Sequence, residues 1–179
     1  TTEIYTLSLH DALPIYRSYL EAGADIIETD TFGSAPVVLA EYDLAHEARR
    51  LNRDAAALAR RVAEEYSTPD KPRFVAGSMG PTTKTISVTG GIAFEELAAD
   101  YHTQAAGLIE GGVDLLLLET SQDTINVKAG LEGIDRAFAE LGREVPVAVQ
   151  GTVEPMGTLL AGQDVEAFYT SLSDRKSVV

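Results

Sequence analysis

One phrase occurs twice in this sequence, and the repeat decides the fold. The first copy is Leu20-Glu21-Ala22-Gly23-Ala24-Asp25-Ile26-Ile27-Glu28-Thr29, and the second is IEGGVDLLLLET at residues 109–120. In each copy a helix-like segment stops at glycine, an aspartate opens a short apolar run, and the run ends in Glu-Thr. A glycine just past a helix supplies the left-handed turn that ends it, and a brief Ile/Leu run is typical of a strand buried on both faces. Each copy therefore predicts a helix-to-strand joint of a parallel α/β protein, with a glutamate where the strand ends.

The rest of the sequence continues to alternate helical and strand-like segments. Apolar residues recur every three or four positions in three segments and predict helices there: about 46–66, 94–108 and 123–142, the last with Asp123 as its N-cap. Short apolar runs predict strands at 73–78, 114–118 and 146–151, and one more helix begins at Gln163.

This alternation, without the glycine fingerprint of a dinucleotide-binding fold, favours a (β/α) barrel over an open doubly wound sheet. A complete barrel needs eight units and typically ~250 residues. The chain is therefore predicted to be either an open sheet or a piece of a larger barrel.

Composition narrows the class of protein. The chain has 179 residues, of which 45% are hydrophobic and 23% charged, as expected for one ordinary globular domain. Its net charge of -14 argues against a nucleic-acid or anionic-membrane surface, because such surfaces need a basic face. No apolar run approaches the ~18 residues that span a bilayer. We expect a cytoplasmic location, with no nucleic-acid or membrane partner. The absence of cysteine excludes a disulfide framework, a thiolate nucleophile and a cysteine metal site in this chain.

Glu28 and Glu119 are the first candidate functional residues. They follow two parallel strands, and the carboxyl ends of such strands are where barrel enzymes build their sites. A carboxylate there could hold a substrate ammonium group, or it could simply cap the next helix or pair with a nearby Lys or Arg. Finding both glutamates at equivalent joints favours a site.

Two further segments carry weaker signals. The segment from Gly77 to Thr85 is rich in Gly, Ser and Thr, whose backbone NH groups and hydroxyls could bind an anion or carboxylate. It could equally be a long surface connection. Gly151-Thr152, at the end of the last predicted strand, is the weakest of these signals, and no histidine has metal-ligand spacing.

Longer phrases carry a family resemblance. They are YLEAGADIIETDTFG at 19–33, LAEYDLAHEA at 39–48, RFVAGSMGPTTKTISVTGG at 73–91, GGVDLLLLETSQDTINVKA at 111–129 and GTLLAGQDVEAFYTSL at 157–172. With these phrases the chain resembles the homocysteine S-methyltransferase family. Within that family it resembles the homocysteine-binding domain of cobalamin-dependent methionine synthases, and the GPTTKT loop separates this branch from the betaine-dependent one.

The resemblance implies a fold and a chemistry. The fold would be a (β/α)8 TIM barrel, of which this chain would hold about strands two to five with their helices. The parent domain would bind homocysteine as a zinc thiolate and transfer to it a methyl group from methylcobalamin, giving methionine. Its partners would be homocysteine and the cobalamin and folate modules of the same protein.

The resemblance also suggests which residues contact substrate. A family glutamate at the end of the fourth barrel strand helps to hold the amino acid, and it matches Glu119. The candidate substrate-binding residues are Glu119, Glu28, Asp30, Thr31, Ser78 and Thr152. Asp30 stands where the family phrase ETNTFG has Asn. The family's three zinc cysteines belong to the later part of the barrel and have no counterpart here, so no catalytic or metal-binding residue is assigned in this chain.

The two ends of the chain depart from this pattern. Residues 1–15 (TTEIYTLSLHDALPI) and 174–179 (DRKSVV) lack the rhythm of the rest and resemble translated sequencing-adapter or vector sequence. We predict a non-native leader at 1–15, a partial homocysteine-binding barrel domain at 16–173 and a non-native tail at 174–179. Such a fragment is predicted to be inactive by itself and marginally folded.

Two alternative functions remain open at this point. One is a homocysteine S-methyltransferase that uses S-methylmethionine or betaine as methyl donor. The other is a metal-free module that binds a small amino acid.

Overall fold

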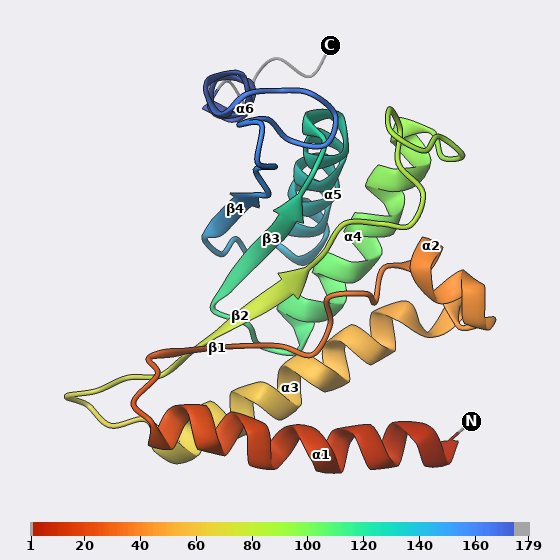
Figure 1. The fold of residues 1–179 in the computed structure, drawn as a ribbon. Helices are drawn as coiled ribbons and strands as arrows, with labels where there is room; N and C mark the ends of the chain where they lie inside the picture. The colour runs from red at the N-terminus through yellow and green to blue at the C-terminus, as the bar shows by residue number, and fades with distance from the viewer. Residues whose placement is uncertain (1, 174–179) are drawn as a thin grey trace.

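The computed structural model describes residues 2–173, and their side chains from residue 12 onward. Helices and strands alternate along most of the chain (Figure 1). The elements are α1 (Thr2–Glu21), β1 (Ile26–Glu28), α2 (Pro36–Leu39), η1 (Ala40–Tyr42), η2 (Ala45–Glu47), α3 (Ala48–Tyr66), β2 (Phe74–Met79), α4 (Phe94–Glu110), β3 (Leu115–Ser121), α5 (Thr124–Leu141), β4 (Val147–Gly151) and α6 (Val165–Ser173). No helix in the described part of the chain is both long enough and apolar enough to cross a membrane.

The strands form one parallel sheet in the order β1-β2-β3-β4. Helices α3, α4 and α5 lie on the same side of this sheet (Figure 1). A doubly wound sheet would reverse its strand order and carry helices on both faces, whereas a barrel advances strand by strand with all its helices outside. The fold is therefore a partial (β/α)8 barrel, which confirms the predicted fold class.

Both copies of the repeated phrase form the predicted helix-to-strand joint. Gly23 and Gly112 have φ values of 105° and 93°, which only glycine adopts without strain. The aspartate after each glycine pairs with an arginine: Asp25 Oδ1 lies 3.1 Å from Arg73 Nη1, and Asp114 Oδ2 lies 2.6 Å from an Arg60 nitrogen. These aspartates therefore anchor the amino ends of the strands, away from the glutamates.

The hydrophobic core lies between the sheet and its helices. Val75, Leu116 and Leu118 point into this layer and are at most 2% exposed. On the opposite, inner face of the sheet Ile26 is 51% exposed and Phe74 is 40% exposed. The structure thus buries one face of the sheet and leaves apolar side chains open on the other.

Two predicted strands end later in the structure. The strand predicted at 73–78 continues to Met79, so Gly77 and Ser78 belong to β2 and the connection begins only at Gly80. The strand predicted at 114–118 extends to Ser121 through a register shift, and Thr120 within it has a φ of 55°. Both strands end later than predicted because hydrogen bonds to neighbouring strands extend regular structure beyond the apolar run.

The predicted boundaries of the domain are not tested by the fold. Helix α1 runs from Thr2 to Glu21 and crosses the predicted boundary between residues 15 and 16. The predicted tail at 174–179 lies outside the described residues.

Candidate functional site

Two of the predicted site residues are joined directly. Ser78 in β2 donates its hydroxyl hydrogen to Glu119 Oε1 in β3, over 2.5 Å between the oxygens. This hydrogen bond fixes one oxygen of the carboxylate at the carboxyl end of the sheet. Among the side chains described, neither Glu28 nor Glu119 forms an ion pair with a basic residue, so both carboxylates are available to a cationic group.

Glu28, at the end of β1, is electrostatically linked to Glu119. Partial burial raises the pKa of Glu28, and the negative charge of Glu119 raises this pKa further. A bound ammonium group would offset both effects, because it stabilises the ionised form of each carboxylate. The pair is therefore better suited to a cation than to an anion.

A chain of hydroxyl groups continues from this pair across β2 to the segment after β1. Thr31 Oγ1 donates to the carbonyl oxygen of Ser78 over 2.7 Å, and Thr29 Oγ1 lies 2.6 Å from Thr31 Oγ1. Because the Thr31 hydrogen goes to the carbonyl, the Thr29 hydroxyl must donate to Thr31. The backbone NH of Ser78 completes the chain by donating to Thr29 Oγ1 over 3.0 Å. These bonds align the ends of β1 and β2 and hold Thr31 with its hydroxyl buried.

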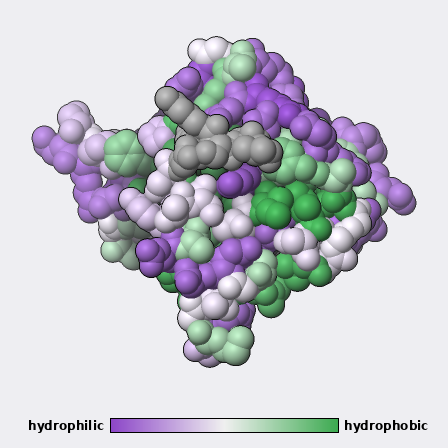
Figure 2. Space-filling view, turned by 90° about the horizontal axis from the view of Figure 1, so that it is seen from above, coloured by the Kyte–Doolittle hydropathy of each residue, from purple (hydrophilic) through white to green (hydrophobic). Residues whose placement is uncertain are grey.

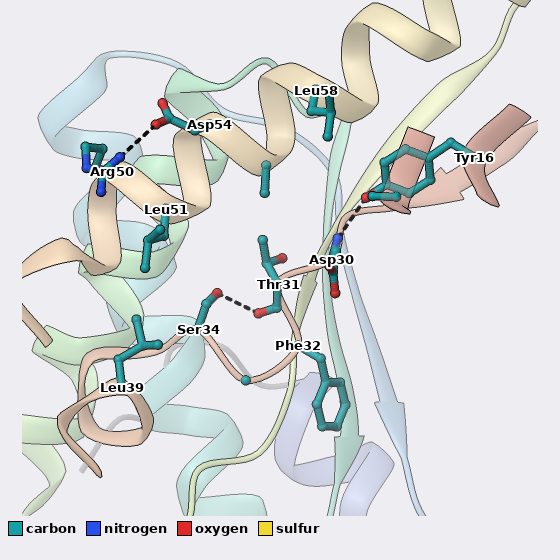
Figure 3. Close-up of a pocket in the computed structure, with 13 residues that line it drawn as sticks. Tyr16, Asp30, Thr31, Phe32, Ser34, Leu39, Arg50, Leu51, Asp54 and Leu58 are labelled. Atoms are coloured by element: carbon teal, nitrogen blue, oxygen red, sulfur yellow. Dashed lines mark hydrogen bonds and ion pairs between the residues drawn. The ribbon is translucent and has the colours of Figure 1, made fainter. Parts of the chain in front are cut away.

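Asp30 occupies a different position. Its side chain is exposed, and its backbone NH donates to the hydroxyl of Tyr16 in α1 over 3.0 Å (Figure 3). Burial raises the pKa of Tyr16 to about 12, so this hydroxyl stays protonated at neutral pH. Asp30 and Tyr16 line a cavity of about 350 Å³ between α1, the segment after β1 and α3. This cavity lies behind the segment that carries Asp30 and is not lined by Glu28 or Glu119.

Thr152 is attached to the site through its backbone. Its NH donates to the carbonyl of Ser121 over 2.8 Å, so it follows β4 beside the end of β3. Seen from above, the face toward which β2 and β3 point is largely hydrophilic, with a hydrophobic patch beside it (Figure 2). The structure thus brings Glu28, Thr31, Ser78 and Glu119 together, while Asp30 and Thr152 lie at the margins.

The connection after β2 folds over the start of α5. Asp123 caps this helix as predicted, accepting from the NH of Ile125 over 2.8 Å, and it also accepts a hydrogen bond from Ser87. Asn126 accepts from the NH of Ile86 over 2.9 Å. The backbone and hydroxyl groups of the Gly- and Thr-rich segment therefore form hydrogen bonds with the start of α5. These contacts favour a structural role for residues 85–89.

The zinc site implied by the resemblance does not fit this chain. The sequence has no cysteine, and the described residues contain no group of three or more His, Asp or Glu side chains placed to hold a metal ion. We therefore assign no step through a metal to these residues.

Two buried amides near the site were not predicted. Gln104 in α4 and Asn52 in α3 are both 0% exposed and contact the segment after β1. Gln104 Nε2 donates to the carbonyl of Thr31 over 2.9 Å, and Asn52 Nδ2 donates to that of Ser34 over 3.0 Å. A polar residue within a buried helix face is the signal that could have identified them.

Fold and site together define a class of protein. A partial (β/α)8 barrel with acidic and hydroxyl side chains at the carboxyl ends of its strands is typical of a domain of a barrel enzyme. A family profile described as homocysteine S-methyltransferase matches residues 10–179. The chain belongs to the homocysteine S-methyltransferase family.

Curated relatives of this chain are methionine synthases. The chain is 44% identical over 153 residues to a methionine synthase of Mycobacterium leprae and 42% identical over 158 residues to one of Mycobacterium tuberculosis. The matches cover 86% and 88% of this chain but only 13% of each relative. The chain thus spans a small part of the length of these proteins.

Solved structures agree on the fold. The homocysteine methyltransferase MmuM from Escherichia coli matches with a TM-score of 0.75 in its metallated form and 0.76 in its oxidised form. Sequence identity is 21% and 20%, and the matches cover 93% and 100% of this chain against 60% and 64% of the MmuM chains. At this identity the similarity concerns the fold.

Proposed function

We propose that this chain is part of a domain that binds homocysteine and passes it a methyl group from methylcobalamin to form methionine. One observation carries the proposal: Glu119, oriented by Ser78 and adjacent to Glu28, presents at the carboxyl end of the sheet a carboxylate that forms no ion pair with the side chains described. The similarity to methionine synthases favours this reaction over one with S-methylmethionine or betaine as donor.

The residues of this chain would recognise the amino-acid part of the substrate. Glu119 and Glu28 would accept hydrogen bonds from the α-ammonium group, since charge-assisted bonds of this kind are the strong ones. Ser78 would keep Glu119 in place, and Thr31 would keep the end of β1 against β2. Asp30 and Thr152, at the margins, are proposed to shape the entrance.

The chemical step would depend on parts outside these residues. Zinc would have to be held by other segments, and methylcobalamin by another module, with the folate module as a further partner. The fragment by itself is therefore proposed to be inactive in methyl transfer. The cytoplasmic location and the division into residues 1–15, 16–173 and 174–179 also stand as proposals.

Calorimetry on the 179-residue chain tests the binding role. We expect L-homocysteine to bind, and Glu119→Gln to weaken binding by about tenfold to a hundredfold, because a hydrogen bond to a charged group contributes ~1.5–3 kcal/mol. The matched control is Glu144→Gln, the same change at an exposed position between α5 and β4. It should leave affinity unchanged.

A ligand control isolates the ammonium group. 4-Mercaptobutyrate lacks this group and should bind far more weakly than homocysteine to the unmodified chain. Equal affinities of the Glu119→Gln variant and the unmodified chain would refute the role of Glu119. Methionine formation by the chain with methylcobalamin would refute its inactivity.

A further inference from the structure

The segment 29–34, which carries Thr31, is held by polar side chains from three helices. Tyr16 of α1 accepts from the NH of Asp30, Asn52 of α3 donates to the carbonyl of Ser34, and Gln104 of α4 donates to the carbonyl of Thr31. All three side chains are buried. A surface connection does not need such support, so the position of this segment is specified by the helices behind the sheet.

The carbonyl of Thr31 is where these contacts converge. Besides Gln104, it accepts from the NH of Ser34 over 3.1 Å, and Ser34 Oγ lies 2.7 Å from it (Figure 3). Ser34 Oγ also lies 2.6 Å from Asn52 Oδ1 and 3.3 Å from Gln104 Nε2. The orientation of the Gln104 amide follows, because its oxygen would repel the Thr31 carbonyl if the amide were reversed.

Gln104 is unusual in leaving one of its own atoms without a partner. Its Oε1 is buried and has no hydrogen-bond partner among the described residues. An unpaired buried acceptor is unfavourable and offsets much of what the hydrogen bond of Nε2 contributes to folding. A methionine side chain fills a similar space without that unpaired acceptor. The amide is therefore of little benefit to global stability, whereas its effect on the position of Thr31 is direct.

We propose that Gln104 is a positioning residue of the substrate site, acting through the carbonyl of Thr31. From Thr31 the contact continues through its hydroxyl to the carbonyl of Ser78, whose side chain orients Glu119. The link from Gln104 to segment 29–34 follows from the structure alone. Its effect on ligand binding rests on the proposed function.

Hydrogen exchange of the 179-residue chain, read by mass spectrometry or NMR, tests the first link without any ligand. In Gln104→Met the Thr31 carbonyl, which accepts from the NH of Ser34, loses the Gln104 donor that holds it in place. Exchange of the Ser34 NH should therefore accelerate by about tenfold or more. The melting temperature should change by no more than about 3 °C. The control is Ile134→Val, a 0%-exposed position in α5, which should lower the melting temperature but leave the exchange of residues 29–34 unchanged relative to other amides.

Calorimetry with L-homocysteine tests the second link. Gln104→Met should bind about tenfold more weakly, and Ile134→Val should bind normally. If Gln104→Met does not fold, Ser34→Ala removes one hydroxyl contact to the same carbonyl and should show the same changes at smaller size.

The outcomes separate the two proposals. Unchanged exchange of Ser34 in a folded variant, or acceleration spread evenly over the whole chain, would overturn the positioning role. Faster exchange of residues 29–34 in a chain that does not bind homocysteine would support the positioning of the segment and refute the proposed function.

Discussion

At the residue scale, the burial of Asp100 makes the stability of the fold depend on pH. It lies in α4 and accepts a hydrogen bond from the NH of Val37, at the start of α2, over 3.0 Å. Burial raises the pKa of Asp100 to about 6; the hydrogen bond and Lys84 oppose this rise, and Glu96 adds to it. The protonated form is thus favoured by folding relative to the unfolded chain, where the pKa is 3.8.

The sign of the stability effect follows from this raised pKa. The contribution of protonated Asp100 is fully present below about pH 4 and is lost as the pH rises through about 6. Asp100→Asn keeps an acceptor for Val37 and cannot ionise. We expect it to be more stable than the unmodified chain at about pH 7, by ~1 kcal/mol after allowing for solvent screening, and no more stable at about pH 4. Urea denaturation at both pH values measures this, and a gain of equal size at both would contradict it.

Residues differ in how well sequence predicts their role. Asp123 could be assigned as an N-cap because the cap and its partner are neighbours in the chain. Glu119 could be placed near a strand end because the phrase that contains it occurs twice in the sequence. Gln104 and Asn52 could not be assigned, because their partners Thr31 and Ser34 lie far away in sequence and only the packed helices bring them together.

At the scale of elements, small residues set how closely the helices pack. In α3 the small residues Ala56 and Ala59 are fully buried, as is Asn52. Leu51 and Ala55 are only half-buried. The cause lies in α4, where a methyl group on Gly107 would lie 2.4 Å from the carbonyl oxygen of Arg49. The two helix backbones approach so closely that only small side chains fit between them.

Gly107→Ala should therefore be destabilising, although alanine is the better helix former. We expect a loss of about 2 kcal/mol or more in the free energy of unfolding, because the clash is with backbone. Gly130→Ala in α5 is the matched control: its methyl would lie too close only to the end of the Leu118 side chain, at 2.8 Å, and would be in ordinary contact with Tyr101 at 3.6 Å. We expect that change to cost about 1 kcal/mol or less, since the side chain can move and alanine favours the helix. Similar losses in chemical denaturation would contradict this account.

At the scale of the whole molecule, the sheet has one buried face and one open face. Leu116 is 0% exposed beneath the helices, whereas Phe74 on the inner face is 40% exposed. Large residues on the two faces should therefore contribute unequally to stability.

Phe74→Thr keeps a strand-forming residue and should cost less than about 1.5 kcal/mol, whereas Leu116→Ala should cost ~2–5 kcal/mol through lost burial and a cavity. The measurement is again the free energy of unfolding in denaturant. A loss for Phe74→Thr as large as that for Leu116→Ala would show that the inner face is covered in solution.

The sequence by itself determined the order of helices and strands, the two glycine-ended joints and the glutamates that follow them. These features depend on neighbours in the chain, whose periodicity and turn residues can be read directly. Only the tertiary structure decided which side chains meet: Ser78 with Glu119, Asp25 and Asp114 with their arginines, and Gln104 with Thr31. Such contacts join residues distant in sequence. They depend on strand register and helix packing, which a local sequence pattern does not specify.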